Sequence, residues 1–169
     1  MSQDAISVNP TKILVPVDFS PSSREALEAA TGLAEKFNAE LYLLHVIPEF
    51  SNAVLPETVK QEDLIEAERK AATERFEISK KALDGKGVKC TVSVEVGGDV
   101  AGTILDAIER ENADLLVFTT HGLSGWYPQV FGSIAEKLVR LVQTPTLLLR
   151  TKKPESSAKV TYSGLMEWW

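Results

Sequence analysis

The sequence predicts an α/β protein built on a single open, parallel, five-stranded sheet with helices on both faces. Two observations predict it. Short apolar runs rich in branched residues alternate with amphipathic stretches of helical spacing from residue 12 to about residue 150. The connections between these runs are too long for hairpins, so the strands are expected to be parallel and joined by right-handed crossovers. We expect a Rossmann-like arrangement with strand order 3-2-1-4-5.

Composition limits the number of domains and the class of ligand. The chain has 169 residues, of which 44% are hydrophobic and 25% charged, which is enough for one core and too little for two ordinary domains. We expect a mobile leader at 1–11, one domain at 12–151 and a tail at 152–169. The net charge of -6 and the absence of a basic cluster argue against binding to nucleic acid or to an anionic membrane.

The chain also lacks the usual signs of export. Cys90 is the single cysteine and cannot form an intramolecular disulfide. The first ten residues are polar, and no stretch approaches the roughly 18 apolar residues of a membrane span. We therefore expect a cytoplasmic protein without membrane insertion.

The first strand and helix have clear signals. Lys12–Phe19 is a continuous apolar run, typical of a strand covered on both faces, and Pro16 is expected to end its regular part. Ser20 can cap the next helix, and Pro21 suits its first position. One apolar stripe predicts that this helix covers the sheet: Ala26, Leu27, Ala30, Leu33, Ala34 and Phe37.

The second and third strands enclose a long helix. Glu40–Ile47 predicts another buried strand, and Glu57–Asp84 is a charge-rich helical stretch. Val88–Val96 alternates apolar and polar residues, which predicts a strand with one partly wet face at a sheet edge. Cys90, on this strand, is expected to be packed or half-exposed.

The last third of the domain repeats the pattern. Asp99 is expected to cap a third helix, and Asp114–Phe118 forms the fourth strand. A connection containing three glycines leads to a fourth helix beginning near Ser133, and Thr144–Leu149 is the fifth strand.

Chemistry in such a sheet is expected beyond the carboxyl ends of the strands. Asp18 follows the first strand there, and a carboxylate suits ribose hydroxyls, although the dipole of the next helix would also favour it. After the fourth strand, Gly122 and Gly125 allow close backbone approach, and Gly132-Ser133 opens a helix with free N–H groups. Together they form a candidate anion site, with an ordinary turn as the alternative. The segment matches neither a Walker loop nor the dinucleotide fingerprint.

Five separated motifs resemble the universal stress protein family, in order and over Lys12 to about Arg150. They are Ile13–Ser20, Leu43–Val46, Asp114–Val117, His121-Gly122 followed by Gly132-Ser133, and Thr144–Leu149. The ATP-binding branch of that family has the pattern Gly-x2-Gly-x9-Gly-Ser/Thr. Gly122, Gly132 and Ser133 match its second glycine, third glycine and hydroxyl, whereas Thr119 stands at the first glycine.

The resemblance implies an ATP or AMP site, with Mg²⁺ as an optional companion. Asp18 would hold the ribose, and the backbone near Val46 the edge of the adenine. Three residues would wall the base: Pro16, Val17 and Phe118. Three would hold the phosphates: Gly122, Gly132 and Ser133. The side chain of Thr119 would either crowd the ribose and α-phosphate or offer its hydroxyl in place of a backbone contact.

Three functions follow as hypotheses. The first is an adenine-nucleotide-binding regulatory module that forms a homodimer through the last strand, Thr146–Arg150, as the resemblance implies, and that acts on a protein partner the sequence does not identify. The second is a family member that binds no nucleotide and acts through protein contacts, with Thr119 and Trp126–Pro128 filling the site. The third is a slow ATP hydrolase, which has least support because no evident base is present.

The two histidines and the two terminal tryptophans are also considered. His121 is either a structural hydrogen-bonding residue or a general base. His45 lies within a predicted buried strand, and no cysteine cluster is present that would favour a metal site. Trp168 and Trp169 are mobile or dock on a partner or on the domain's own groove.

Overall fold

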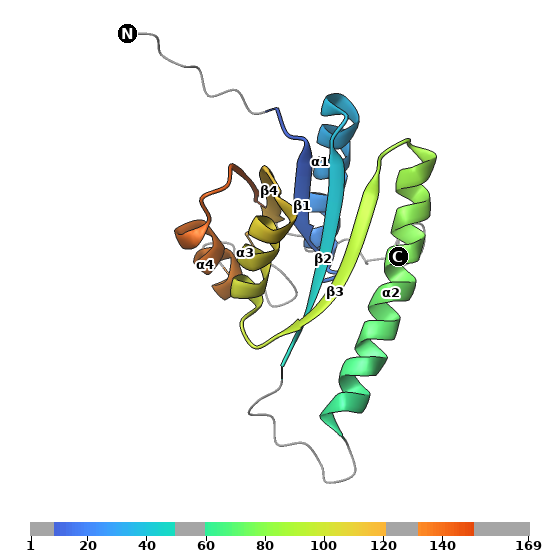
Figure 1. Cartoon of the computed structure of the whole chain (residues 1–169), viewed down its shortest axis with the longest axis vertical. Helices are drawn as coiled ribbons and strands as arrows, with labels where there is room; N and C mark the ends of the chain where they lie inside the picture. Colours follow the sequence, from blue (N-terminus) through green and yellow to red (C-terminus); the bar gives the residue numbers. More distant parts are fainter. Residues whose placement is uncertain (1–8, 50–59, 121–131, 151–169) are drawn as a thin grey trace, which may run out of the picture.

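The computed structural model describes residues 9–49, 60–120 and 132–150 (Figure 1). These ranges contain the predicted five-stranded parallel sheet, and its strand order β3-β2-β1-β4-β5 is the predicted one. The strands are β1 Lys12–Pro16, β2 Glu40–Pro48, β3 Cys90–Gly97, β4 Leu115–Thr119 and β5 Thr146–Leu149. The helices are α1 Pro21–Phe37, α2 Gln61–Gly85, α3 Val100–Glu111 and α4 Ser133–Leu141.

The sheet is covered on both faces. Figure 1 shows α1 and α2 on one side and α3 and α4 on the other. Alternate residues of β1 point to opposite sides, so Ile13 and Val15 pack toward α1 and α2, while Leu14 packs toward α3 and α4. Because all three are fully buried, the first apolar run needs no polar face, as the sequence predicted.

The helix ends follow the sequence signals in α1. Ser20 is its N-cap and accepts a hydrogen bond from the Ser23 N–H at 3.1 Å, and Pro21 occupies the first turn. Asn38 closes the helix in the left-handed conformation, with φ 55°. Asn112 closes α3 in the same way. The predicted start of α1 is therefore confirmed.

The position predicted for the cap of α3 is confirmed, because Asp99 is its N-cap residue. Its side chain makes no capping hydrogen bond of regular geometry, but the carboxylate pairs with the Lys137 ammonium of α4. The hydrogen bond to Lys137 is the main reason why the pKa of Asp99 is lowered, and the backbone N–H groups of Gly102 and Ala101 lower it further. The contact with Lys137 joins two helices, so no spacing rule along α3 could show it.

Two other differences concern element ends. Helix α2 begins at Gln61, and residues 57–59 of the predicted helical stretch lie outside the described ranges. Strand β3 is an edge strand, as predicted, and all but one of its residues are partly buried. Cys90 packs against the core from this edge, and burial raises the pKa of its thiol to about 12. Within the described part of the chain, no helix is long and apolar enough to cross a membrane.

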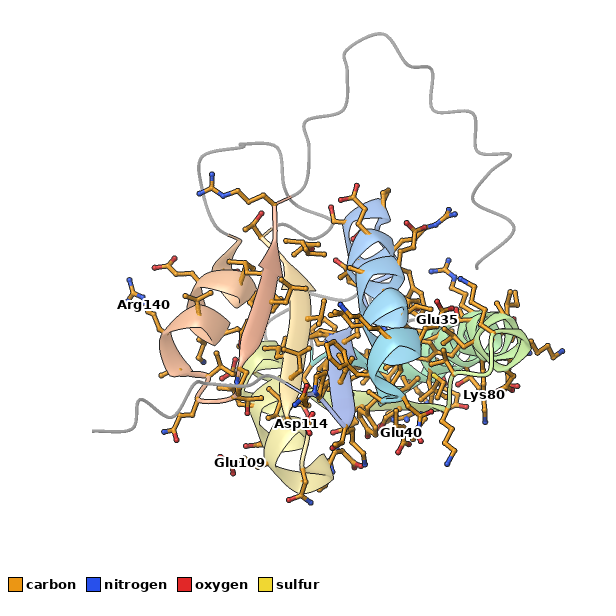
Figure 2. The ribbon with its side chains drawn as sticks, turned by 90° about the horizontal axis from the view of Figure 1, so that it is seen from above. Glu35, Glu40, Lys80, Glu109, Asp114 and Arg140 are labelled. Atoms are coloured by element: carbon orange, nitrogen blue, oxygen red, sulfur yellow. The ribbon has the colours of Figure 1, made fainter. Side chains whose placement is uncertain are left out.

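Asp114 joins the starts of β1 and β4 (Figure 2). Its two carboxylate oxygens accept hydrogen bonds from the Thr11 N–H at 2.9 and 3.0 Å, from the Thr11 hydroxyl at 2.6 Å and from the Lys12 N–H at 3.0 Å. Partial burial alone would raise the pKa of Asp114, but these hydrogen bonds outweigh it and the pKa is lowered. The charged form of Asp114 therefore stabilises the register of the central strand pair.

We predict that Asp114→Asn lowers the free energy of unfolding by about 1 kcal/mol at pH 7, a figure discounted because the clamp is partly exposed to solvent. A carboxyl whose pKa is lowered by folding stabilises the protein above its unfolded pKa of about 4 and loses that contribution as pH falls through the lower folded pKa. Urea unfolding of both proteins from pH 7 to pH 3 should show the gap closing below about pH 4. A gap that is constant with pH would contradict the assignment.

Candidate functional site

A cavity of about 580 Å³ lies beyond the carboxyl ends of the strands. Eight of the nine predicted site residues line it: Pro16, Val17, Asp18, Val46, Phe118, Thr119, Gly132 and Ser133. The ninth, Gly122, lies outside the described residues, as do His121 and Trp126–Pro128. The structure thus gathers residues from four separate segments at one edge of the sheet.

Asp18 is held at the end of β1 by a local hydrogen bond. The last backbone hydrogen bond between the end of β1 and β2 runs from the Val17 N–H to the Leu44 carbonyl at 2.8 Å, and the chain then leaves the sheet. The Ser20 N–H then donates to Asp18 Oδ1 at 3.0 Å. The carboxylate is therefore oriented by the N-cap residue of α1, and it lines the cavity.

Phe19 is a member of the cavity wall that the sequence did not predict. Its backbone has φ 59°, a left-handed conformation that costs about 1–2 kcal/mol for a residue with a Cβ. Its ring lies 4.8 Å from the His45 ring and 5.2 Å from the Phe76 ring, measured between centroids. This packing offsets the strain, and the resulting turn brings Asp18 to the edge of the cavity.

The backbone of Val46 faces the gap beyond β1. Along β2, the Glu40 N–H donates toward β1 and the Leu44 carbonyl accepts from β1, whereas the Leu41 N–H donates toward β3. Backbone groups alternate with a period of two, so the N–H and C=O of Val46 also point toward the β1 side. Because β1 ends at Pro16, which pairs with Leu44, these groups lie past the end of their neighbouring strand.

The N-terminus of α4 supplies backbone donors to the cavity. The first helical hydrogen bond runs from the Glu136 N–H to the Gly132 carbonyl at 2.9 Å. The N–H groups of the three residues between them, Ser133 to Ala135, thus lie outside the hydrogen-bond ladder of the helix. All three residues line the cavity. A helix N-terminus with such donors attracts anions.

Gly132 is the N-cap residue of α4. Its N–H donates to the Thr120 carbonyl at 3.0 Å, so this donor is already used inside the protein. A Cβ added at Gly132 would lie 3.4 Å from the same carbonyl, an ordinary van der Waals contact. The donors that lie outside the helix ladder come one to three residues later.

Thr119 is the last residue of β4 and is paired with Leu149 of β5. It is partly buried and lines the cavity between Phe118 and Thr120. The position where the family pattern has its first glycine is thus part of the cavity wall. A side chain here affects the space that is open to a ligand.

His45 connects β2 to the end of β1. Its Nδ1 lies 2.7 Å from the Val17 carbonyl oxygen, and its Nε2 lies 3.7 Å from Glu68 Oε1 on α2. The ring is buried and lines the cavity. Sequence reasoning placed His45 in a buried strand and assigned it no site.

Further residues of the cavity wall come from two helices, α2 and α3, which contain none of the five sequence motifs described above. Helix α2 contributes Glu68, Ala71, Ala72 and Arg75, and α3 contributes Val100 and Ile104. Nothing in the sequence relates α2 to the strand ends. These residues are therefore visible as site residues only in the folded chain.

The cavity combines apolar walls, two carboxylates, Asp18 and Glu68, and a row of backbone donors. Among the described residues, no group of three or more His, Cys, Asp or Glu side chains is placed to hold a metal ion. A ligand with an apolar ring, a middle part that carries hydroxyl groups and an anionic end would find suitable partners for each part in this cavity.

A model of the universal stress protein family matches residues 10–150. This match spans most of the chain and includes every strand and helix described above. The chain belongs to the universal stress protein family.

Curated relatives of this universal stress protein agree with the match. Universal stress protein MJ0531 of Methanocaldococcus jannaschii is 31% identical over 144 residues, which cover 85% of this chain and 84% of the relative. Universal stress protein YxiE of Bacillus subtilis is 30% identical over 155 residues, covering 82% and 98%.

Solved structures share the fold. The structure of the hypothetical protein MJ0577 superposes with a TM-score of 0.76 at 27% identity, covering 86% of this chain and 99% of the other. A universal stress protein solved in complex with cAMP has a TM-score of 0.58 at 22% identity, covering 85% and 98%. One from Archaeoglobus fulgidus, solved with dAMP, has a TM-score of 0.57 at 21% identity, covering 82% and 96%.

Proposed function

We propose that this universal stress protein binds an adenine nucleotide, ATP or AMP, in the cavity and acts as a cytoplasmic regulatory module. The observation that carries the proposal is the pairing of Asp18 with the N-terminus of α4 in one apolar-walled cavity. A carboxylate suits ribose hydroxyls and free helical N–H groups suit phosphate, so the two ends of a nucleotide each have a partner. Cell fractionation would check the cytoplasmic placement.

Each part of the nucleotide has an assigned contact. Asp18 binds the ribose, and the backbone N–H and C=O of Val46 bind the edge of the adenine. The base lies among Pro16, Val17 and Phe118. The phosphates lie against the first turn of α4, with Ser133 offering its hydroxyl and Gly132 leaving the start of the helix without a side chain.

Solved relatives also support a nucleotide, because family members with the same fold were solved with cAMP and with dAMP. Mg²⁺ is an optional companion that the phosphates of ATP would bring. Gly122 keeps the phosphate role that the family pattern gives it, as a proposal from the motif alone.

We predict that the protein binds ATP at or below millimolar concentration and that Asp18→Ala weakens this binding about tenfold, because hydrogen bonds to a charged group are lost. Isothermal titration calorimetry with ATP measures both proteins. Glu25→Ala is the matched control, since it removes an exposed carboxylate from α1 outside the cavity. Wild-type protein that binds no adenine nucleotide would refute the function, and equal affinity of Asp18→Ala would refute the ribose contact.

We predict that Thr119→Gly strengthens ATP binding, because the Thr119 side chain takes up space in the cavity wall. Thr119→Ser separates the two interpretations, since it keeps the hydroxyl and removes the methyl group. If the Thr119 side chain crowds the ligand, the affinity for ATP should rise from the wild type to Thr119→Ser and again to Thr119→Gly. If the Thr119→Gly protein binds ATP more weakly than the Thr119→Ser protein does, the hydroxyl of Thr119 contacts the ligand and the crowding interpretation is excluded.

We also propose that the protein is a homodimer formed through Thr146–Arg150. Strand β5 is at the edge of the sheet, and Leu147 is 36% exposed on it. An edge strand with apolar side chains favours pairing with a second chain. Light scattering after size-exclusion chromatography should show a dimer for the wild type and a monomer for Leu147→Glu. Leu64→Glu, a similarly exposed leucine on α2, should leave the dimer intact. A monomeric wild type would contradict this proposal.

A further inference from the structure

The last residues of the sequence are aromatic and lie beyond the family domain. Residues 151–169 follow the family match, which ends at residue 150, and they lie outside the described ranges. The sequence is polar over residues 152–157, whereas Leu165-Met-Glu-Trp-Trp169, the aromatic end, has four large apolar side chains among five residues. Two adjacent tryptophans left in water would form an apolar patch, which soluble proteins usually cover. A surface that covers the aromatic end is therefore expected.

Strand β5 brings the chain to the cavity before these residues begin. The carbonyl of Leu149, the last residue of β5, accepts a hydrogen bond from the Thr120 N–H at 3.0 Å, and Thr120 lines the cavity. Arg150 therefore leaves the sheet beside the cavity wall. Roughly 14 residues separate Arg150 from Leu165, and an extended chain spans about 3.3 Å per residue, so the aromatic end can reach any part of the cavity.

The cavity has apolar surface where it meets solvent. Ile134 lines it from the first turn of α4 and is 43% exposed, although the neighbouring N–H groups suit an anion. Ala71 lines it from α2 and is also exposed. Helices α2 and α4 cover opposite faces of the sheet (Figure 1), so an apolar residue is exposed on each side. Nucleotide phosphates gain nothing from this apolar surface, whereas an aromatic side chain would bury it.

The aromatic end carries the chemical groups that the cavity suits. An indole is a flat apolar ring, and large apolar side chains wall the inner cavity: Ile104, Phe118 and Leu138. Glu167 places a carboxylate beside Trp168, and a carboxylate is favoured near the first N–H groups of α4. Burial of one aromatic side chain removes about 150–250 Å² of surface from water, which supplies the driving force for docking.

We propose that the aromatic end docks in the cavity of its own chain and that a nucleotide must displace it. The docking follows from the chain and the cavity, whereas the competition rests on the proposed nucleotide binding. Because the segment is attached to β5, docking is intramolecular and does not depend on protein concentration. The apparent affinity for the nucleotide falls in proportion to the fraction of molecules whose cavity is open. Nucleotide binding in turn releases the aromatic end from the domain.

The tail tryptophans report the docking directly. The chain has three tryptophans, so Trp126→Phe leaves Trp168 and Trp169 as the remaining ones. We expect their emission at shorter wavelength than in urea-unfolded protein, and we expect acrylamide to quench it several-fold less. Adding Ala71→Glu places a charge in the cavity wall and should raise the quenching toward the unfolded value. Ala67→Glu, at an exposed alanine one turn earlier on α2 and outside the cavity, should keep the protection.

Calorimetry with ATP measures the competition in the full chain. Trp168→Ala combined with Trp169→Ala should bind ATP about fivefold more tightly than the wild type, which corresponds to an aromatic end that fills the cavity in roughly four of five molecules. Val160→Ala removes an apolar group from the same tail outside the aromatic end, so it should keep the wild-type affinity. ATP added to the Trp126→Phe protein should raise the quenching of the two tail tryptophans.

The outcomes separate the docking from the nucleotide function. Protection that Ala71→Glu removes, without ATP binding by the wild type or the double alanine variant, would refute the nucleotide function and support the docking. ATP binding by a chain whose tail tryptophans are quenched as fully as in urea would overturn the docking alone. ATP binding that leaves the protection unchanged would overturn the competition.

Two further outcomes would place the aromatic end elsewhere. Protection that persists in Ala71→Glu would show that the segment lies outside the cavity, and protection that is lost on dilution would show that it docks on a second chain. Either result overturns the inference. Thermal unfolding of each variant confirms that the comparison is made on folded protein.

Discussion

The early end of the central strand is the constraint on which the site depends. Strand β1 pairs with β2 only as far as Pro16 and Leu44, whereas β2 and β3 remain paired to Pro48 and Gly97. The missing N–H of Pro16 lies on the β4 side of β1, so it ends the ladder toward β4, and the chain leaves the sheet after the Val17 N–H has donated to Leu44. The overhang of β2 supplies the floor of the cavity, the backbone groups of Val46 and the side chain of His45.

The turn after β1 is stabilised by packing rather than by local preference. A phenylalanine is a poor choice for a left-handed backbone, and a glycine would take that conformation without strain. Phe19 remains there because its ring fills the space between His45 and Phe76. The contact between the Phe19 and Phe76 rings joins α2 to the end of β1.

The sequence predicted the order and type of every described element because each carries its own periodicity. It also predicted the edge position of Val88–Val96 and the N-cap Ser20, which rest on local patterns. Contributions from α2 were not predictable, since the face that a helix turns toward a cavity is fixed by contacts distant in the chain. The pairing of Asp99 with Lys137 was not predictable for the same reason, because the two residues lie 38 positions apart in the chain.

Asp18 shows why two sequence interpretations can both be correct. As a carboxylate near a helix N-terminus it accepts the Ser20 N–H, which is the structural role considered for it. That bond uses Oδ1 and fixes the orientation of the carboxylate in the cavity wall. A preoriented carboxylate loses less side-chain entropy when it binds a ribose hydroxyl. The structural bond therefore makes Asp18 a better ligand group, and finding that bond is no argument against a role in binding.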